Sequence, residues 1–201
     1  MPSKFGELAF TPEVKAAQEQ RGSREIYDRY ISQGSANDSI TPKLEKFIAQ
    51  LDGFYLGTVS SSGYPYIQFR GGQPGFLKVL DEKTLGFADF SGNVQYITVG
   101  NLSRSDRAFL FLMDYRHRKR VKVWGRARII EDDLALIQQL QDPNYPAKIE
   151  RAILFEVEAF SENCPQHIPV RYSEAEVERK VEAAVAPLQA RIAELERQLN
   201  S

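Results

Sequence analysis

Residues 118–129 read RKRVKVWGRARI, and their alternation predicts a β-strand with two unlike faces. Successive side chains of a strand point to opposite sides. One face would carry Arg118, Arg120, Lys122, Trp124, Arg126 and Arg128. The other would carry Lys119, Val121, Val123, Gly125, Ala127 and Ile129. The second face can enter a core. The first is either a solvated sheet surface or, with an indole ring among cations, a surface for a phosphorylated planar ligand.

The same period of two continues on both sides of this strand and divides the chain into hairpins. The predicted strands are residues 54–60, 64–70, 76–80, 84–90, 107–114, 119–131 and 151–161. Between them, residues 93–102 and 132–141 are expected to form short helices. Strands in hairpin order with few intervening helices indicate an antiparallel barrel or sandwich and argue against a parallel sheet.

The two ends of the chain are expected to be helical. Residues 1–50 form an N-terminal extension, in which Thr11-Pro12 and Thr41-Pro42 each combine an N-cap with a proline at the first helical position. The barrel would then occupy residues 51–165, and residues 166–201 would form a tail with an amphipathic helix.

The tail helix carries an apolar seam. Its members recur every three or four residues, at Val177, Val181, Val185, Leu188, Ile192, Leu195 and Leu199. This spacing is typical of a coiled coil, although Pro187 predicts a kink or a fresh helix start. The seam could be covered by a second copy of the chain or could fold back on its own barrel.

Composition narrows the classes of function. The formal net charge of −1 over 201 residues provides no global field for nucleic acid, and no apolar run is long enough to span a membrane. Cys164 is the one cysteine, so no intramolecular disulfide can form, and a cytoplasmic protein is expected. His117 and His167 fall in different predicted elements, which predicts no metal site.

The sequence also shows no catalytic constellation. Cys164 and His167 lie close in the chain, but nothing around them resembles a nucleophile elbow. Gly71-Gly72 with Gly75 lacks the spacing of a phosphate loop and reads as a break where backbone can approach a ligand. The turn Ser91-Gly92-Asn93 offers a helix N-terminus that could bind phosphate or could simply cap a helix.

Several motifs resemble one family. The segments PYIQFR (65–70), LGFADFSGN (85–93), GNL (100–102) and VKVWGRA (121–127) resemble, in order and spacing, the pyridoxamine 5'-phosphate oxidase-like, FMN-binding split-barrel superfamily. The resemblance covers roughly residues 50–165, and NCPQHI at 163–168 is similar to a segment in a subgroup. It implies a mainly β fold with peripheral helices (α+β), a six-stranded antiparallel split barrel, a homodimer, and FMN at the subunit interface.

The resemblance also implies cofactor-binding residues. They are Gln68, Phe69, Arg70, Gly71, Phe87, Ala88, Asp89, Asn93, Gln95, Arg120, Gln166 and His167. Asn93-Val94 stands where the true oxidases have a phosphate-binding Arg-Lys pair, so Arg70 and Arg120 are expected to compensate. Gln166 and His167 would reach the flavin from the second subunit.

The expected function is that of an FMN-dependent oxidoreductase that takes hydride from NAD(P)H and needs no catalytic side chain. Arg116, Arg118 and Lys119 could attract the nicotinamide cofactor. The chain ends in AELERQLNS instead of the oxidases' substrate clamp, so vitamin B6 oxidation is not expected. The alternatives are a non-catalytic flavin sensor whose tail docks a partner, a haem-binding barrel with His167 as axial ligand, and a deazaflavin in place of FMN.

Overall fold

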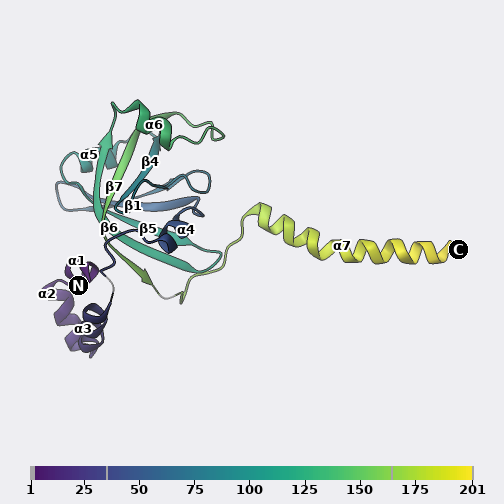
Figure 1. Ribbon diagram of the computed structural model, residues 1–201, viewed down its shortest axis with the longest axis horizontal. Coiled ribbons are helices and arrows are strands. Elements are labelled where there is room, and N and C mark those ends of the chain that lie inside the picture. The colour runs from purple at the N-terminus through teal and green to yellow at the C-terminus, as the bar shows by residue number, and fades with distance from the viewer. Residues whose placement is uncertain (1–2, 35, 164, 201) are drawn as a thin grey trace.

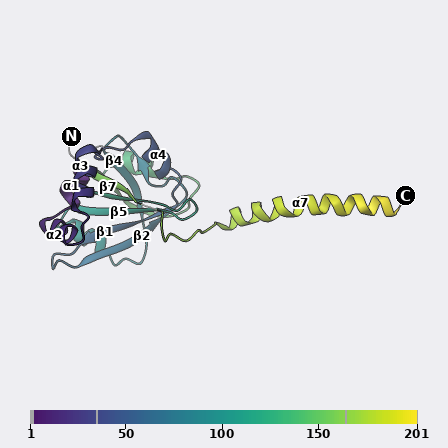
Figure 2. The same ribbon diagram turned by 90° about the horizontal axis from the view of Figure 1, so that it is seen from below.

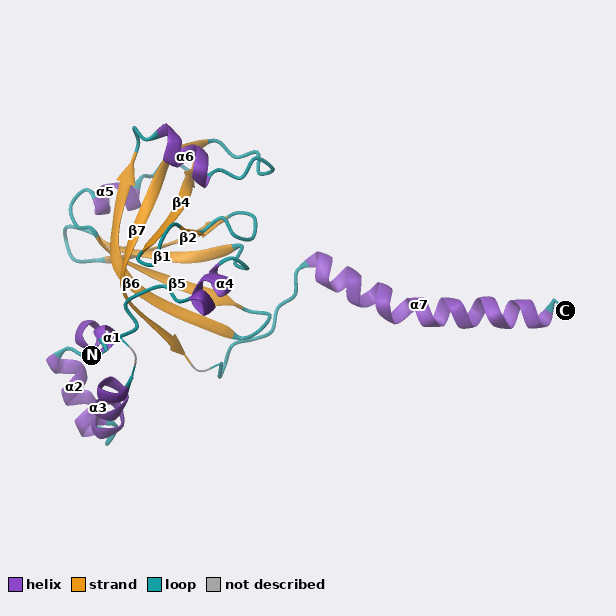
Figure 3. Cartoon of the chain, viewed as in Figure 1, coloured by secondary structure: helices purple, strands orange, loops and turns teal. Residues whose placement is uncertain are grey.

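The fold is a curled antiparallel sheet with helices around it (Figures 1 and 3). The computed structural model describes residues 3–34, 36–163 and 165–200. In these residues the strands are β1 (Gly53–Val59), β2 (Pro65–Gly71), β3 (Lys78–Val79), β4 (Thr84–Phe90), β5 (Arg107–Asp114), β6 (Lys119–Ile130) and β7 (Ile149–Asn163). They pair antiparallel in the order β2-β1-β5-β6-β7-β4-β3. The barrel is therefore split between β2 and the β3–β4 end.

The resemblance implies six strands and the period of two predicts seven; the described residues form seven, of which β3 is a two-residue strand at the edge. The fold class is otherwise confirmed as mainly antiparallel β with peripheral helices. The two faces of residues 118–129 are also confirmed, since Val121, Val123, Gly125 and Ala127 are buried. Gly125 lies at a bulge against β7, where an added Cβ would meet the Glu156 carbonyl oxygen at 2.0 Å. A larger residue there would force the two strands apart.

The core fills the inside of the curled sheet. Phe54 and Leu56 from β1 meet Leu110 and Leu112 from β5 on the inner face, because strand side chains alternate. The largest fully buried side chains include Phe54, Phe87 and Phe155. Burial of these rings supplies much of the apolar surface removed from water on folding.

The N-terminal residues form helices α1 (Lys4–Ala9), α2 (Pro12–Gln20), α3 (Arg24–Gln33) and α4 (Pro42–Ile48). Both predicted N-caps are confirmed: the Thr11 hydroxyl accepts from the Val14 N–H at 3.4 Å, and the Thr41 hydroxyl accepts from the Leu44 N–H at 3.2 Å. Helix α4 packs Leu44 and Ile48 into the barrel core. Helices α1–α3 form a group beside the barrel (Figure 1), and the Phe5 ring of α1 lies 5.3 Å from the Trp124 ring of β6.

Two short helices begin later than the sequence predicts. Helix α5 is Ile97–Leu102, so the predicted start at residue 93 is wrong, and α6 is Leu134–Leu140. Asn93 does not cap a helix, because its side-chain oxygen accepts from the nearby Gln95 N–H at 3.3 Å. That local turn keeps residues 93–96 out of the helix.

The tail forms α7 (Glu174–Leu199), which runs away from the barrel in both views (Figures 1 and 2). Ser173 and Glu176 make a capping box at its start. Of the two alternatives predicted for Pro187, a kink or a fresh start, the structure has the kink: a single helix contains the proline, and it changes direction near its middle (Figure 1). No helix among the described residues is long and apolar enough to cross a membrane.

Candidate functional site

A small pocket lies where the barrel is split. Its volume is about 210 Å³, and β2, β4, the loop before α5 and the start of β7 enclose it. It is lined by Tyr66, Gln68, Arg70, Asp89, Phe90, Gly92, Asn93, Val94, Gln95, Tyr96, Ile97, Thr98, Val99 and Glu150. Gln68 and Arg70 reach it together because they are two residues apart on one strand.

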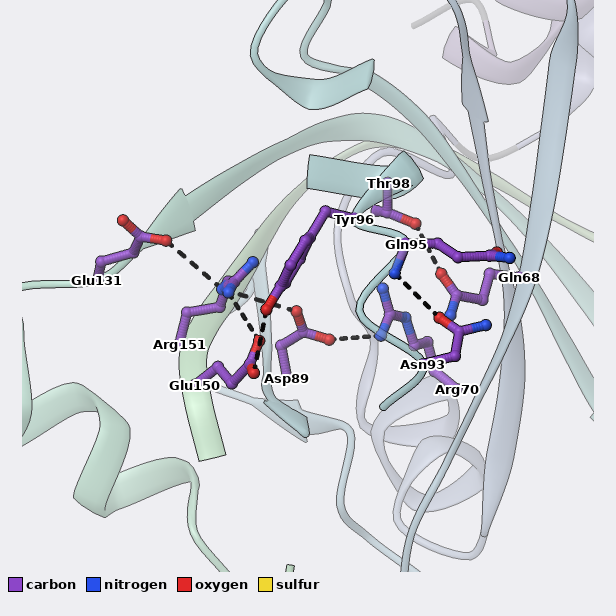
Figure 4. A network of polar contacts seen from close by, with 10 residues as sticks. All are labelled: Gln68, Arg70, Asp89, Asn93, Gln95, Tyr96, Thr98, Glu131, Glu150 and Arg151. Carbon is purple, nitrogen blue, oxygen red and sulfur yellow. Dashed lines mark hydrogen bonds and ion pairs between the residues drawn. The ribbon is translucent and has the colours of Figure 1, made fainter. Parts of the chain in front are cut away.

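An ion pair spans the split between β2 and β4. The Arg70 guanidinium donates through Nη1 to Oδ1 of Asp89, and the two side chains are only 14% and 6% exposed. On the other side of Asp89, the Nε atom of Arg151 lies 3.9 Å from Oδ2 (Figure 4). Arg151 also donates from Nη2 to Glu150 Oε2 at 2.8 Å. Two guanidinium groups thus flank one buried carboxylate.

The two guanidinium groups are nearly balanced in charge by the carboxylates of Asp89 and Glu150, but not every N–H group of the arginines has a hydrogen-bond partner within the described part of the chain. Burial raises the pKa of the Asp89 carboxyl, Arg70 and Arg151 oppose this rise, and Glu150 adds to it. The Nε atom of Arg70 is buried and has no hydrogen-bond partner among the described residues. A buried donor without a partner is unfavourable, so this atom is available to an anionic ligand.

The loop before α5 has an unusual backbone. Val94 and Tyr96 have φ angles of 54° and 52°, in the left-handed region that β-branched and aromatic residues rarely adopt. The Thr98 hydroxyl donates to Gln68 Oε1 at 2.9 Å, and the Tyr96 hydroxyl donates to Glu150 Oε1 at 3.4 Å. Side chains of β2 and β7 therefore hold the loop in this conformation. Strained backbone that is held in this way is concentrated at functional sites.

One edge of β4 beside the pocket is unpaired over its second half in the described structure. Strand β3 pairs with Leu85 and Gly86, and β7 pairs along the opposite edge of β4. Among the described residues no strand lies beside the other edge from Phe87 to Phe90. Phe87, Ala88 and Asp89 are nevertheless buried, and from this edge only Asp89 and Phe90 line the pocket.

The pocket brings together Gln68, Arg70, Asp89, Asn93 and Gln95 from the predicted set. Gly71 ends β2, while Phe87 and Ala88 are buried in β4. Phe69 points to the other side of β2, where it is 58% exposed and packs on Tyr55. Its ring cannot line the pocket together with its two strand neighbours.

Three predicted residues lie elsewhere. Arg120 lines a larger cavity of about 730 Å³ between α4 and the β5–β6 hairpin, and it is the only member of the predicted set there among the described residues. Gln166 and His167 are exposed in the turn after β7. Cys164 lies outside the described residues. Groups of three or more His, Cys, Asp or Glu side chains that could hold a metal are absent from the described part of the chain.

Sequence reasoning missed Tyr96, Thr98, Glu150 and Arg151. Tyr96 and Thr98 were expected inside a helix, and Glu150 lies just before the predicted last strand. Arg151 was expected at the start of that strand, with no signal that it would face Asp89.

Comparison with known proteins identifies the family. The family model for pyridoxamine 5'-phosphate oxidase matches residues 40–159, which is more than half of the chain. The chain belongs to the pyridoxamine 5'-phosphate oxidase family. This match begins just before α4 and ends within β7, so it takes in residues from all seven strands of the described barrel and the whole pocket at the split.

Solved structures show the same fold at low identity. HupZ from Group A Streptococcus has a TM-score of 0.51 and 15% identity, over 66% of this chain and 99% of that chain. A variant of the same streptococcal protein has a TM-score of 0.50 and 16% identity, over 62% and 99%. An FMN-binding protein from Syntrophomonas wolfei subsp. wolfei has a TM-score of 0.49 and 14% identity, over 74% and 97%. No curated protein matches the sequence.

Proposed function

We propose that this chain binds FMN with its phosphate in the pocket at the split of the barrel, and that it acts as an NAD(P)H-linked oxidoreductase. The observation that carries the proposal is the convergence of Gln68, Arg70, Asp89, Asn93 and Gln95 on one pocket with a strained loop. Membership in the pyridoxamine 5'-phosphate oxidase family supports it.

The donors of the pocket fit a phosphate group. Arg70 offers its buried, unpartnered Nε, and the backbone N–H groups of Asn93, Val94 and Tyr96 make no hydrogen bond within the described residues. Backbone N–H groups in turns with left-handed residues commonly bind anions. The side-chain amides of Gln68 and Asn93 add further donors. These groups would stand in for the Arg-Lys pair that the family resemblance implies at this position.

The pocket in one chain is too small to enclose a whole flavin. Its volume of about 210 Å³ lies below the ~300–1,000 Å³ of ordinary small-molecule sites. The isoalloxazine ring would therefore lie outside the pocket, beside the unpaired edge of β4 near Asp89 and Phe90. When bound, FMN supplies the redox chemistry by accepting hydride from NAD(P)H and passing electrons to an acceptor. Residues of this chain bind and orient it.

A second copy of the chain would complete the site. The outer face of β1 and β2 exposes Val59, Ile67 and Phe69, and an apolar groove of about 710 Å³ runs over it between Tyr55 and Trp124. Exposed apolar surfaces of this kind mark interaction sites. A homodimer through this face would cover the groove and would shield a flavin at the nearby edge from water.

The test is the visible spectrum of the purified protein, with the released cofactor identified by mass. We expect flavin absorption bands, the mass of FMN, and anaerobic bleaching by NADH or NADPH. A colourless protein that takes up no added FMN would contradict the proposal. A Soret band would indicate haem, and a different flavin mass would indicate a deazaflavin. A bound flavin that stays oxidised with both donors would leave FMN binding without the oxidoreductase activity.

A further inference from the structure

The seam of α7 is a long apolar surface without a partner in the described structure. Its seven apolar side chains are between 37% and 86% exposed, and no residue of α7 is buried. The helix also projects away from the barrel (Figures 1 and 2), so it does not fold back to cover this surface. We propose that α7 forms a parallel, two-stranded coiled coil with α7 of a second copy of this chain.

The spacing of the seam defines a heptad register. Apolar residues from Val181 to Leu199 alternate in steps of four and three. Position a is held by Val185, Ile192 and Leu199, and position d by Val181, Leu188 and Leu195. Two of the three a positions are β-branched and two of the three d positions are leucine, a pattern that favours a parallel dimer over trimers and tetramers. At 1.5 Å per residue this seam is about 27 Å long.

The two irregular features of the helix are compatible with this register. Val177 lies four residues before Val181, which adds a second step of four and locally unwinds a coiled coil, so the regular seam begins at Val181. Pro187 occupies position c, which faces away from the partner helix. It removes one helical hydrogen bond but places no proline ring between the helices.

The flanking charges select the orientation. In a parallel pair, Arg191 at position g faces Glu196 at position e of the other helix, and symmetry makes this contact twice. In a fully overlapping antiparallel pair, Glu182 would face Glu196, and Arg191 would face its own copy. Arg191 now pairs with Glu194 on its own helix at 2.7 Å, an exposed pair that is weak and can be exchanged.

The start of the helix is attached to the barrel. Arg116 in the β5–β6 hairpin pairs with Glu176, and the Arg171 guanidinium lies 4.3 Å from the centre of the Tyr115 ring. The ion pair holds the first turn of α7, and the ring contact holds the segment just before it, at the tip of that hairpin. A parallel coiled coil therefore places both barrels at the same end, in the two-fold arrangement that is most common among homodimers.

Cross-linking in the full-length chain tests the proposal. In a Cys164→Ser background, Leu195→Cys places a thiol at position d, and Arg197→Cys places one at the outward position f as the matched control. Under mild oxidation at micromolar concentration, we expect Leu195→Cys to form covalent dimers roughly a hundredfold faster than Arg197→Cys, because pairing raises the effective thiol concentration toward millimolar. Adding Ile192→Lys should reduce the rate to that of the control.

Equal rates of covalent dimer formation for the two cysteine variants would overturn the proposal. The seam of α7 would then be a surface for a different protein. Faster cross-linking between Leu195→Cys and Val185→Cys than between two copies of Leu195→Cys would overturn the parallel orientation. In the Leu195→Cys background, Arg191→Glu should slow cross-linking by roughly fivefold, because two attractive contacts become repulsive. Arg191→Glu with Glu196→Arg should restore the rate, which a merely structural effect of Arg191 would not do.

Discussion

The Asp89 carboxylate lies between two guanidinium groups and connects the two sides of the split barrel. Arg70 reaches it from β2, and Arg151 approaches it from β7. A buried ion pair adds little net stability, but removing one partner leaves an uncompensated charge that costs about 3–5 kcal/mol. The same pair also places Arg70 against the proposed phosphate site, so stability and ligand binding are linked through one residue.

The two roles of Arg70 can be separated by mutation. Arg70→Ala should lower the free energy of unfolding by about 3 kcal/mol, because Asp89 loses its nearest cation. It should also weaken FMN binding about tenfold to a hundredfold, through loss of a charge-assisted hydrogen bond of about 1.5–3 kcal/mol. In Arg70→Ala/Asp89→Asn, stability measured by urea unfolding should recover while FMN affinity measured by flavin fluorescence stays low. Arg21→Ala at the C-cap of α2 is the control, and unchanged FMN affinity in both Arg70 variants would place the phosphate elsewhere.

The raised pKa of Asp89 predicts a particular dependence of stability on pH. Since burial raises this pKa above its ordinary value of 3.8 in the folded state, the folded protein holds a proton over a range where the unfolded chain does not. Relative to Asp89→Asn, the wild type should therefore gain stability as the pH falls from neutral through the raised pKa, and the gain should end near 3.8. Urea unfolding of both proteins across this range measures the difference. A difference that moves in favour of Asp89→Asn on acidification would mean that the arginines dominate over burial.

At the scale of elements, the loop before α5 holds strain that substitution can release. Val94 is β-branched and exposed, with a φ of 54°. Asparagine tolerates this region, so Val94→Asn should raise the free energy of unfolding by about 1 kcal/mol. Val94→Thr keeps the β-branch and the strain, so it should show no gain in the same urea titration. Equal effects of the two substitutions would mean that the loop is not strained at this residue.

The bounds of the strands and helices show which parts of the fold the sequence could predict and why it could not predict the others. Strand β5 begins and ends where its period of two predicts, and β6 differs by one residue at its end, because each strand buries one face. Strand β3 has two residues instead of the predicted five. Helix α5 begins four residues later than predicted, because a local turn forms at Asn93. Short elements are set by such local hydrogen bonds, which a hydrophobic period does not report.

The residues of the site also divide into those that a local sequence pattern predicts and those that only the pairing of distant strands brings together. Gln68 and Arg70 could be placed together because alternate residues of a strand share a face, and that same alternation puts Phe69 on the opposite side. Glu150 reaches the pocket, and Arg151 reaches Asp89, only through the pairing of β4 with β7. A local sequence pattern cannot predict a contact between residues more than sixty positions apart in the chain, so Glu150 and Arg151 were not in the predicted set.

For the molecule as a whole, the chain presents two separate apolar surfaces, the outer face of β1 and β2 and the seam of α7. Ile67 on the first surface is 67% exposed, so Ile67→Glu should change the stability of an isolated chain by no more than about 0.5 kcal/mol. If a second copy completes the FMN site through this face, the buried charge should weaken both self-association and FMN affinity by about tenfold or more.

In an Ile192→Lys background, which disrupts the α7 coiled coil, sedimentation velocity and FMN titration of the same samples measure the two effects together. Ile26→Glu on α3 is a matched control, since Ile26 is 59% exposed and lies in the helical group beside the barrel. It should leave both quantities unchanged. The informative contrary result is an Ile67→Glu protein whose barrels separate while FMN affinity stays at the wild-type value. One chain alone would then hold the cofactor, and a flavin beside the unpaired edge of β4 would need no cover from a second copy.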